Sequence, residues 1–168
     1  MKNIELKISL PNNINMSKAL KEIGAKHKGK LFQVDTYFCC SKGRLKTREI
    51  NNKKFEIIFY QRPNKKASKV SNYQIINLDK SQLEEIKHLF KNIFGEKTVV
   101  KKRRDLWIYK NTRIHLDKVL GLGAFLELET VVNKITINKA REENNEIINL
   151  LRINNFKKLS KSYSDMIS

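Results

Sequence analysis

Apolar and polar residues alternate along several short stretches of the chain, which is the pattern of β-strands buried on one face. Within residues 2–9, Ile4, Leu6 and Ile8 share one face, and the residues between them are polar. The same pattern predicts further strands at 31–39, 44–50, 55–62, around Tyr73, 99–109, 112–118 and 124–131. We expect 99–109 to be bent or broken near its middle. Short strands separated by turn residues predict an antiparallel sheet.

Three segments carry helical features instead. The first covers residues 17–23, and the third covers 142–151. The second follows Asp79, which can cap it, and ends before Gly95. Helices therefore interrupt a series of strands, and this order predicts an α+β fold with helices packed outside an antiparallel sheet or barrel. A length of 168 residues with few glycines and prolines indicates one domain, 1–168.

The second face of the predicted strands carries charges of both signs at alternate positions. Glu5 shares a face with Lys7, and Glu127 shares one with Glu129. Two other strands present the sets Arg44, Lys46, Arg48 and Arg113, His115, Asp117. If the sheet closes on itself, its apolar faces lie outside under the helices, and its charged faces line a tunnel.

The Glu127 and Glu129 pair indicates a metal-binding site. Residues two apart on a strand lie roughly 7 Å apart, so each carboxylate raises the cost of ionising the other unless a cation lies nearby. Magnesium takes one or two protein carboxylates and completes its shell with water and phosphate oxygens. Arginine and lysine side chains would then neutralise the remaining charge of a phosphate-rich ligand. The pattern predicts a site for a divalent metal ion and an anionic ligand.

The net charge supports an anionic partner. The chain has 35 Lys and Arg against 17 Asp and Glu, which gives +18 and favours phosphate-rich ligands. We expect many of the lysines only to solvate the surface. A nucleic-acid-binding module would gather basic and aromatic residues on an open surface. Because the distinctive cations here alternate with carboxylates, we expect a small-molecule partner and no nucleic acid.

The cysteines and the N-terminus indicate a reducing compartment. Cys39 and Cys40 are adjacent in a predicted strand, so their side chains point to opposite faces and cannot form a normal disulfide. The first residues lack the apolar run of a signal peptide, and no later segment reaches the length of a membrane span. We expect a cytoplasmic monomer or homodimer with no membrane association.

Several stretches of the chain resemble, in order, the strands of the CYTH superfamily, which includes class IV adenylyl cyclases and thiamine triphosphatases. The N-terminal run Asn3-Ile4-Glu5-Leu6-Lys7 is similar to the ExExK signature of that family. Further similar stretches are 33–38, 43–49, 60–63, 102–104, 112–117, 121–123, 125–129 and 162–164. The resemblance covers nearly the whole chain. It implies a closed antiparallel barrel of about eight strands, whose lumen is a triphosphate tunnel with a bound metal ion.

The resemblance also implies roles for single residues. It implies that Mg²⁺ or Mn²⁺ is held by Glu5, Glu127, Glu129 and Asp117. It implies that the triphosphate is bound by Lys7, Arg44, Lys46, Arg62, Lys102, Arg104 and Arg113. Within these two sets, the catalytic roles fall to Glu5, Glu127, Glu129 and Lys46.

Three parts of the chain fit these roles less simply. Asn3 stands where the signature has its first glutamate, so it either offers the metal an uncharged oxygen or hydrogen-bonds a neighbouring strand. We expect His115 to be a hydrogen-bonded structural residue. In the basic run 101–104, alternation alone does not decide which pair faces the lumen, and the resemblance selects Lys102 and Arg104.

These features predict an enzyme that hydrolyses a triphosphate with a divalent metal ion. The substrates that fit are inorganic tripolyphosphate, thiamine triphosphate and a nucleoside triphosphate. One alternative is a class IV adenylyl cyclase, which would use the same tunnel to convert ATP to cyclic AMP and pyrophosphate. Another is a non-catalytic protein that binds polyphosphate or nucleic acid. The chain has no Walker pattern, no zinc-like cysteine spacing and no Ser-His-Asp order.

Overall fold

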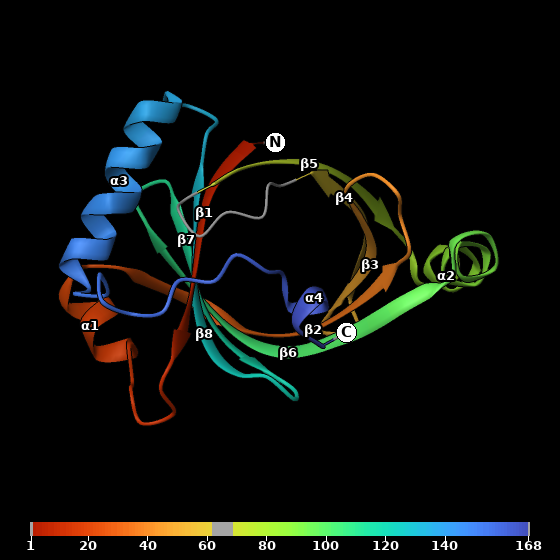
Figure 1. The fold of residues 1–168 in the computed structure, drawn as a ribbon, viewed down its shortest axis with the longest axis horizontal. Coiled ribbons are helices and arrows are strands. Elements are labelled where there is room, and N and C mark those ends of the chain that lie inside the picture. Colours follow the sequence, from red (N-terminus) through yellow and green to blue (C-terminus); the bar gives the residue numbers. More distant parts are fainter. Residues whose placement is uncertain (1, 62–68, 168) are drawn as a thin grey trace.

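The computed structural model describes residues 2–61 and 69–167, and its strands close into a barrel (Figure 1). The eight strands are β1 (Lys2–Leu10), β2 (Lys26–Phe38), β3 (Arg44–Ile50), β4 (Lys54–Gln61), β5 (Lys69–Leu78), β6 (Glu96–Tyr109), β7 (Thr112–Val119) and β8 (Gly123–Val131). They follow the order β1-β5-β4-β3-β2-β6-β7-β8 around the barrel, and neighbours are antiparallel. The predicted closed antiparallel barrel is confirmed.

The described helices are α1 (Ser17–Glu22), α2 (Lys80–Phe94), α3 (Ile137–Leu150) and α4 (Tyr163–Ile167). Helices α1 and α3 lie together on one side of the barrel, and α2 lies at the opposite side (Figure 1). This arrangement confirms the predicted α+β fold with helices outside the sheet. Within the described ranges, no helix combines the length and the apolar character needed to cross a membrane.

The main apolar core lies between the outer face of the barrel and helices α1 and α3. Alternation along β1, β7 and β8 turns their aliphatic side chains outward, where the two helices cover them. The most buried residues of this core are Leu6, Ile8, Leu20, Ile114, Leu126, Leu128, Ile147 and Ile153, each at most 2% exposed. Because the aliphatic residues pack outside, the charged residues of the same strands face the lumen.

Strand β6 differs from the sequence prediction, because it is continuous from Glu96 to Tyr109 and the expected break is wrong. It pairs along its length with β2, which begins at Lys26 and not near residue 31. The register between the two strands shifts twice, once between Tyr37 and Phe38 and once, within β2, between His27 and Gly29. Gly29 has a φ of 133°, which favours glycine at this bulge.

The helix boundaries follow their capping residues. The predicted cap of α2 is confirmed, since the Asp79 carboxylate accepts from Gln82 N (2.8 Å) and the Gln82 side chain accepts from Asp79 N (2.9 Å). Helix α3 begins at Ile137, well before the predicted start, because Thr136 Oγ1 accepts from Lys139 N. The short helix α4 was not predicted.

Helix α3 is joined to the β6–β7 turn through one buried carboxylate, which gives a test of the fold. Glu143 accepts from Asn111 N (2.8 Å), Asn111 Nδ2 (2.9 Å) and Thr112 Oγ1 (2.7 Å). We predict that Glu143→Ala lowers the free energy of unfolding by about 1–3 kcal/mol, because the buried Thr112 hydroxyl and the two part-buried Asn111 donors lose their acceptor. Urea unfolding measures the change. The neighbouring exposed Glu142→Ala is the control, and equal losses from both variants would contradict the assigned role.

Candidate active site

The lumen of the barrel contains a cavity of about 480 Å³ lined by charged side chains. This volume is within the usual range for small-molecule sites. Strand alternation decides which charges face it: Lys102 and Arg104 line the cavity and are buried, whereas Lys101 and Arg103 are exposed. The structure therefore places the pair selected by the family resemblance in the lumen.

Strands β1, β8 and β7 place lumen residues in two rows across the wall. One row consists of Lys7, Glu127 and His115, which are register partners across the three strands. Lys7 Nζ lies 3.8 Å from Glu127 Oε1, and His115 Nδ1 lies 3.8 Å from Glu127 Oε2. This row thus places the Glu127 carboxylate of β8 between side chains of the two neighbouring strands.

The next row consists of Glu5, Glu129 and Arg113. Arg113 Nη2 lies 2.9 Å from Glu129 Oε2, so this glutamate is ion-paired. Glu5 is almost fully buried, and one of its carboxylate oxygens accepts a hydrogen bond from the Tyr73 hydroxyl. The three predicted carboxylates Glu5, Glu127 and Glu129 therefore lie on adjacent positions of one wall.

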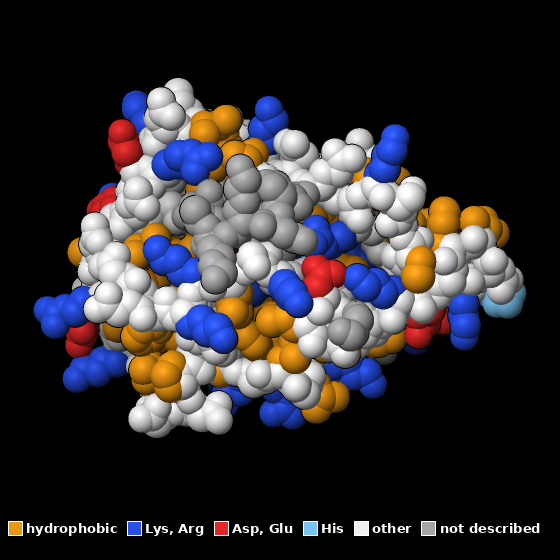
Figure 2. Space-filling model, in the orientation of Figure 1, with side chains coloured by type: hydrophobic (Ala, Val, Ile, Leu, Met, Phe, Trp, Pro, Cys, Tyr) orange, Lys and Arg blue, Asp and Glu red, His pale blue; other side chains and the backbone are white. Residues whose placement is uncertain are grey.

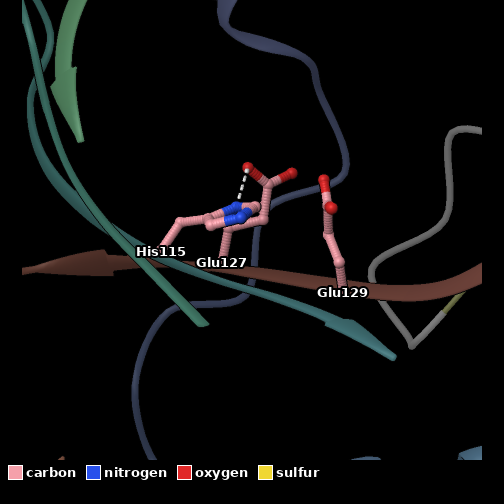
Figure 3. Close-up of side chains that lie close together, drawn as sticks. All are labelled: His115, Glu127 and Glu129. Carbon is pink, nitrogen blue, oxygen red and sulfur yellow. Dashed lines mark ion pairs between the residues drawn. The ribbon is translucent and has the colours of Figure 1, made fainter. Parts of the chain in front are cut away.

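One cluster in this wall has the geometry of a metal site. Ligand atoms of His115, Glu127 and Glu129 all lie within 4.8 Å of one another, and Figure 3 shows Glu127 between the other two side chains. Carboxylate oxygens are the ligands that Mg²⁺ and Mn²⁺ prefer. Among the described residues, buried His115 Nδ1 has no hydrogen-bond partner, so the expected hydrogen bond is not formed at this nitrogen.

The ionisation states of this cluster fit metal binding. Burial and the nearby Arg104 lower the pKa of His115, which leaves the imidazole neutral at pH 7. Burial opposes ionisation of the glutamates, but the positive charge of Lys7 keeps the pKa of Glu127 well below its usual range. The pKa of Glu129 is also lowered, against the effect of burial, by His115 and Arg113. Two ionised carboxylates and a neutral ring nitrogen thus lie together as possible metal ligands.

On another part of the wall, Asp35 of β2 is surrounded by cations. It is 1% exposed and accepts from Lys46 Nζ (2.8 Å) and from Arg48 Nε (2.8 Å) and Nη2 (3.0 Å). Lys102 Nζ lies 3.6 Å away. Burial opposes ionisation of Asp35, but these cations hold its pKa well below the usual range. Asp35 was not singled out from the sequence, and Arg48 was placed on a charged strand face without being given a binding role.

Arg104 links Asp117 to the metal cluster. Its guanidinium makes a bidentate pair with Asp117 (both contacts 2.7 Å) and also donates to Glu127 Oε2 (3.1 Å). Asp117 also accepts from the Tyr163 hydroxyl (2.9 Å). Tyr163 begins α4, and Lys7 Nζ lies 3.8 Å from the centre of its ring. Asp117 thus holds Arg104 and Tyr163 in place, and it lies outside the cluster of His115, Glu127 and Glu129.

Three further residues, Arg44, Asn3 and Arg62, were considered from the sequence. Arg44 donates to Asp165 of α4 (2.8 Å) and lines a second, more open pocket that does not include the metal cluster. Asn3 lines the main cavity, and one orientation of its amide accepts from Arg113 Nη2 at 3.3 Å. Arg62 lies outside the described residues.

Comparison with known proteins identifies the family. A family model for the CYTH domain matches residues 1–163. The chain belongs to the CYTH family. A protein of the archaeon Methanocaldococcus jannaschii, named "Putative adenylate cyclase", is 28% identical over 173 residues, which cover 97% of each chain.

Solved structures of similar proteins share the fold. The PH1012 protein from Pyrococcus horikoshii has a TM-score of 0.82 at 24% identity, with 99% of each chain covered. A "putative adenylate cyclase" from Vibrio parahaemolyticus has a TM-score of 0.76 at 17% identity, with 98% of this chain and 97% of that chain covered.

The Asp35 cluster gives a test that does not depend on the substrate. Asp35→Asn should lower the free energy of unfolding at about pH 7 by about 3–5 kcal/mol, because it leaves buried cations without their counter-charge. The folded-state pKa of Asp35 is depressed, so its contribution is complete above the unfolded pKa and is lost as pH falls through the folded pKa. The difference between the variant and the parent should therefore shrink below about pH 4.

Chemical denaturation across this pH range measures the effect. Asp105→Asn is the control, because Asp105 is only half-buried and pairs with His27 on the outside of the barrel. The role of Asp35 would be contradicted if both variants lost the same free energy of unfolding. It would also be contradicted if the loss in Asp35→Asn did not change with pH.

Proposed function

We propose that this protein is a divalent-metal-dependent hydrolase of a triphosphate bound in the barrel lumen. One observation carries the proposal: the cavity holds both the cluster of His115, Glu127 and Glu129 and several buried cations. These cations are Lys46 and Lys102 near Asp35, and Lys7 and Arg104 near Glu127. Metal ligands and phosphate-binding groups are the two components that phosphoryl transfer requires. Membership of the CYTH family agrees with this proposal.

Basic residues on several strands would bind the triphosphate. Lys46 and Lys102 approach the cavity from the Asp35 part of the wall, and Arg113 approaches it from the metal-cluster part. Arginine can engage two phosphate oxygens at once, and lysine acts as a point charge. Burial and the neighbouring Arg104 lower the pKa of Lys102 to about 7. A bound phosphate would favour its protonated form.

The carboxylates would hold the metal ion. Glu127 and Glu129, with His115 and the adjacent Glu5, are the residues that would bind Mg²⁺ or Mn²⁺. When bound, such an ion neutralises charge on the phosphates and lowers the pKa of a coordinated water. Burial of Glu5, His115 and Glu127 restricts bulk water around the reacting groups. The protein would thus contribute mainly positioning and charge neutralisation.

A second candidate is an adenylyl cyclase that uses the same cavity. It is favoured by the names of two similar proteins, the one from M. jannaschii and the one from V. parahaemolyticus. In a cyclase, the ribose 3′-hydroxyl would replace water as the nucleophile, and pyrophosphate would leave. The two candidates need the same metal and phosphate groups but release different products.

The metal assignment predicts a loss of activity without a loss of fold. Glu127→Gln and Glu129→Gln should each reduce turnover by about 100-fold or more, because a neutral amide binds Mg²⁺ or Mn²⁺ less well. The assay supplies tripolyphosphate, thiamine triphosphate and nucleoside triphosphates with Mg²⁺ or Mn²⁺. Phosphate, pyrophosphate and cyclic nucleotide are measured separately, which distinguishes the hydrolase from the cyclase.

Glu49→Gln is the matched control for this experiment. Glu49 is a β-strand glutamate that contacts Lys87 of helix α2, on the outside of the barrel, and its loss should leave turnover unchanged. Full activity of both lumen variants with metal present would contradict the metal assignment. No product from any triphosphate with either ion would contradict the proposed function.

A separate prediction concerns triphosphate binding. Arg113→Ala or Lys46→Ala should weaken triphosphate affinity by about 10- to 100-fold, since a charge-assisted contact contributes about 1.5–3 kcal/mol. Calorimetry with tripolyphosphate measures this affinity. Lys21→Ala and Lys161→Ala remove exposed charges outside the barrel strands and should have little effect. Equal losses from all four variants would indicate diffuse attraction to a basic surface.

A further inference from the structure

The basic run on β6 has a second face that the proposed function does not use. Lys102 and Arg104 are 4% and 5% exposed in the lumen, whereas Lys101 and Arg103 are exposed on the outside of the barrel. Strand alternation thus gives β6 one basic surface on each side of the wall. The outer residues lie roughly 7 Å apart along the strand.

Neighbouring strands extend this outer basic surface. Arg103 is the register partner of Lys118 on β7 and of Phe32 on β2, so the three form one row across the wall. Phe32 is 49% exposed, while the next residue, Gln33, is 3% exposed in the lumen. Lys30 lies two positions from Phe32 on the same strand and is exposed. We call Lys30, Phe32, Lys101, Arg103 and Lys118 the outer basic face.

The cations of the outer basic face differ from those of the lumen in their surroundings. In the described part of the chain, no carboxylate lies within 4.0 Å of Lys30, Lys101, Arg103 or Lys118. Asp105 lies on the same outer face, two positions from Arg103 and opposite Lys30 in register, and its carboxylate contacts His27. Arg103 and Lys118 are like charges directly opposite each other, which destabilises a sheet. An anionic ligand would remove this repulsion.

We propose that the outer basic face binds single-stranded nucleic acid. Its cations would contact successive phosphates, and the exposed Phe32 ring beside Arg103 would stack on a base. An aromatic side chain within a basic, otherwise open sheet surface is the arrangement that single-strand binders use. Lysine and arginine side chains are spread over the visible face in Figure 2, but the in-register aromatic distinguishes this surface from general positive charge.

The proposal revises the expectation that nucleic acid is not a partner. That expectation relied on cations alternating with carboxylates, and this holds for the lumen, where Asp35 and Asp117 are paired with Lys46, Arg48 and Arg104. On the outside of β6, Lys101, Arg103 and the opposing Lys118 have no carboxylate between them, and Asp105 lies at the end of this basic run. An anionic lipid surface would also attract the lysines, but it would not require an aromatic ring in the same row as the cations.

Fluorescence anisotropy with a short labelled oligouridylate, without divalent metal, tests the proposal. Arg103→Gln/Lys118→Gln should raise the Kd about tenfold or more, since two phosphate contacts are lost. It should also reduce the slope of log Kd against log salt, between about 50 and about 200 mM, by about 1.4. Phe32→Ala should raise the Kd about fivefold or more, and Phe32→Tyr should keep parental affinity, because stacking depends on the ring.

Matched controls separate binding at this surface from binding elsewhere on the protein. Lys21→Gln/Lys139→Gln removes the same charge from exposed positions on α1 and α3, and Lys102→Gln removes a lumen cation. Both should keep the parental Kd, and circular dichroism checks that each variant is folded. Equal weakening by the two double variants, or an unchanged Kd in folded Phe32→Ala, overturns the proposal. Binding to phosphatidylserine vesicles without binding to the oligonucleotide also overturns it.

Discussion

Pairing of opposite charges inside the barrel is the constraint on which the structure depends. An isolated buried charge is very costly, and a buried pair is tolerated only when its geometry is good. Here Asp35 is shared by cations from β3 and β6, and Asp117 is bound bidentately by Arg104. These partners come from neighbouring strands, β3–β2–β6 and β6–β7, so the pairing and register of the sheet bring them together. The apolar outer faces pack under the helices, and the lumen charges favour the register in which each carboxylate lies among cations.

The sequence predicted the lumen best where one face of a strand is apolar. In β1, β7 and β8 the aliphatic residues mark the outside, so the inward position of Glu5, Arg113 and Glu127 followed from alternation. The sequence could not orient 101–104, because both faces of β6 are basic there. Asp35 was missed because its importance comes from partners on other strands. Helix α4 was missed since its position depends on contacts such as that between Tyr163 and Asp117.

Under the proposed function, charge pairing also links metal binding to triphosphate binding. Glu127 contacts Lys7 and Arg104, and Glu129 contacts Arg113, so a metal ion must compete with cations for the same oxygens. A triphosphate offers those cations other anionic partners and releases the carboxylates. Each ligand then favours the other by the same free energy, as linkage requires. This reciprocity favours entry of the metal together with the triphosphate over metal binding to the free protein.

The outer and lumen faces of β6 differ in how strongly water and salt screen the repulsion between their cations. This difference explains why the lumen cations are paired with carboxylates and the outer ones are not. On the outside, salt and water screen the repulsion between Arg103 and Lys118, so the fold tolerates unpaired cations there. In the lumen, screening is weak, and Lys102 and Arg104 need the carboxylates that surround them. Anion binding on the outside should therefore weaken steeply with salt, while binding in the lumen should depend mainly on exchanging one ionic partner for another. Under the two proposals, one strand would thus carry two anion-binding surfaces that differ in their dependence on salt.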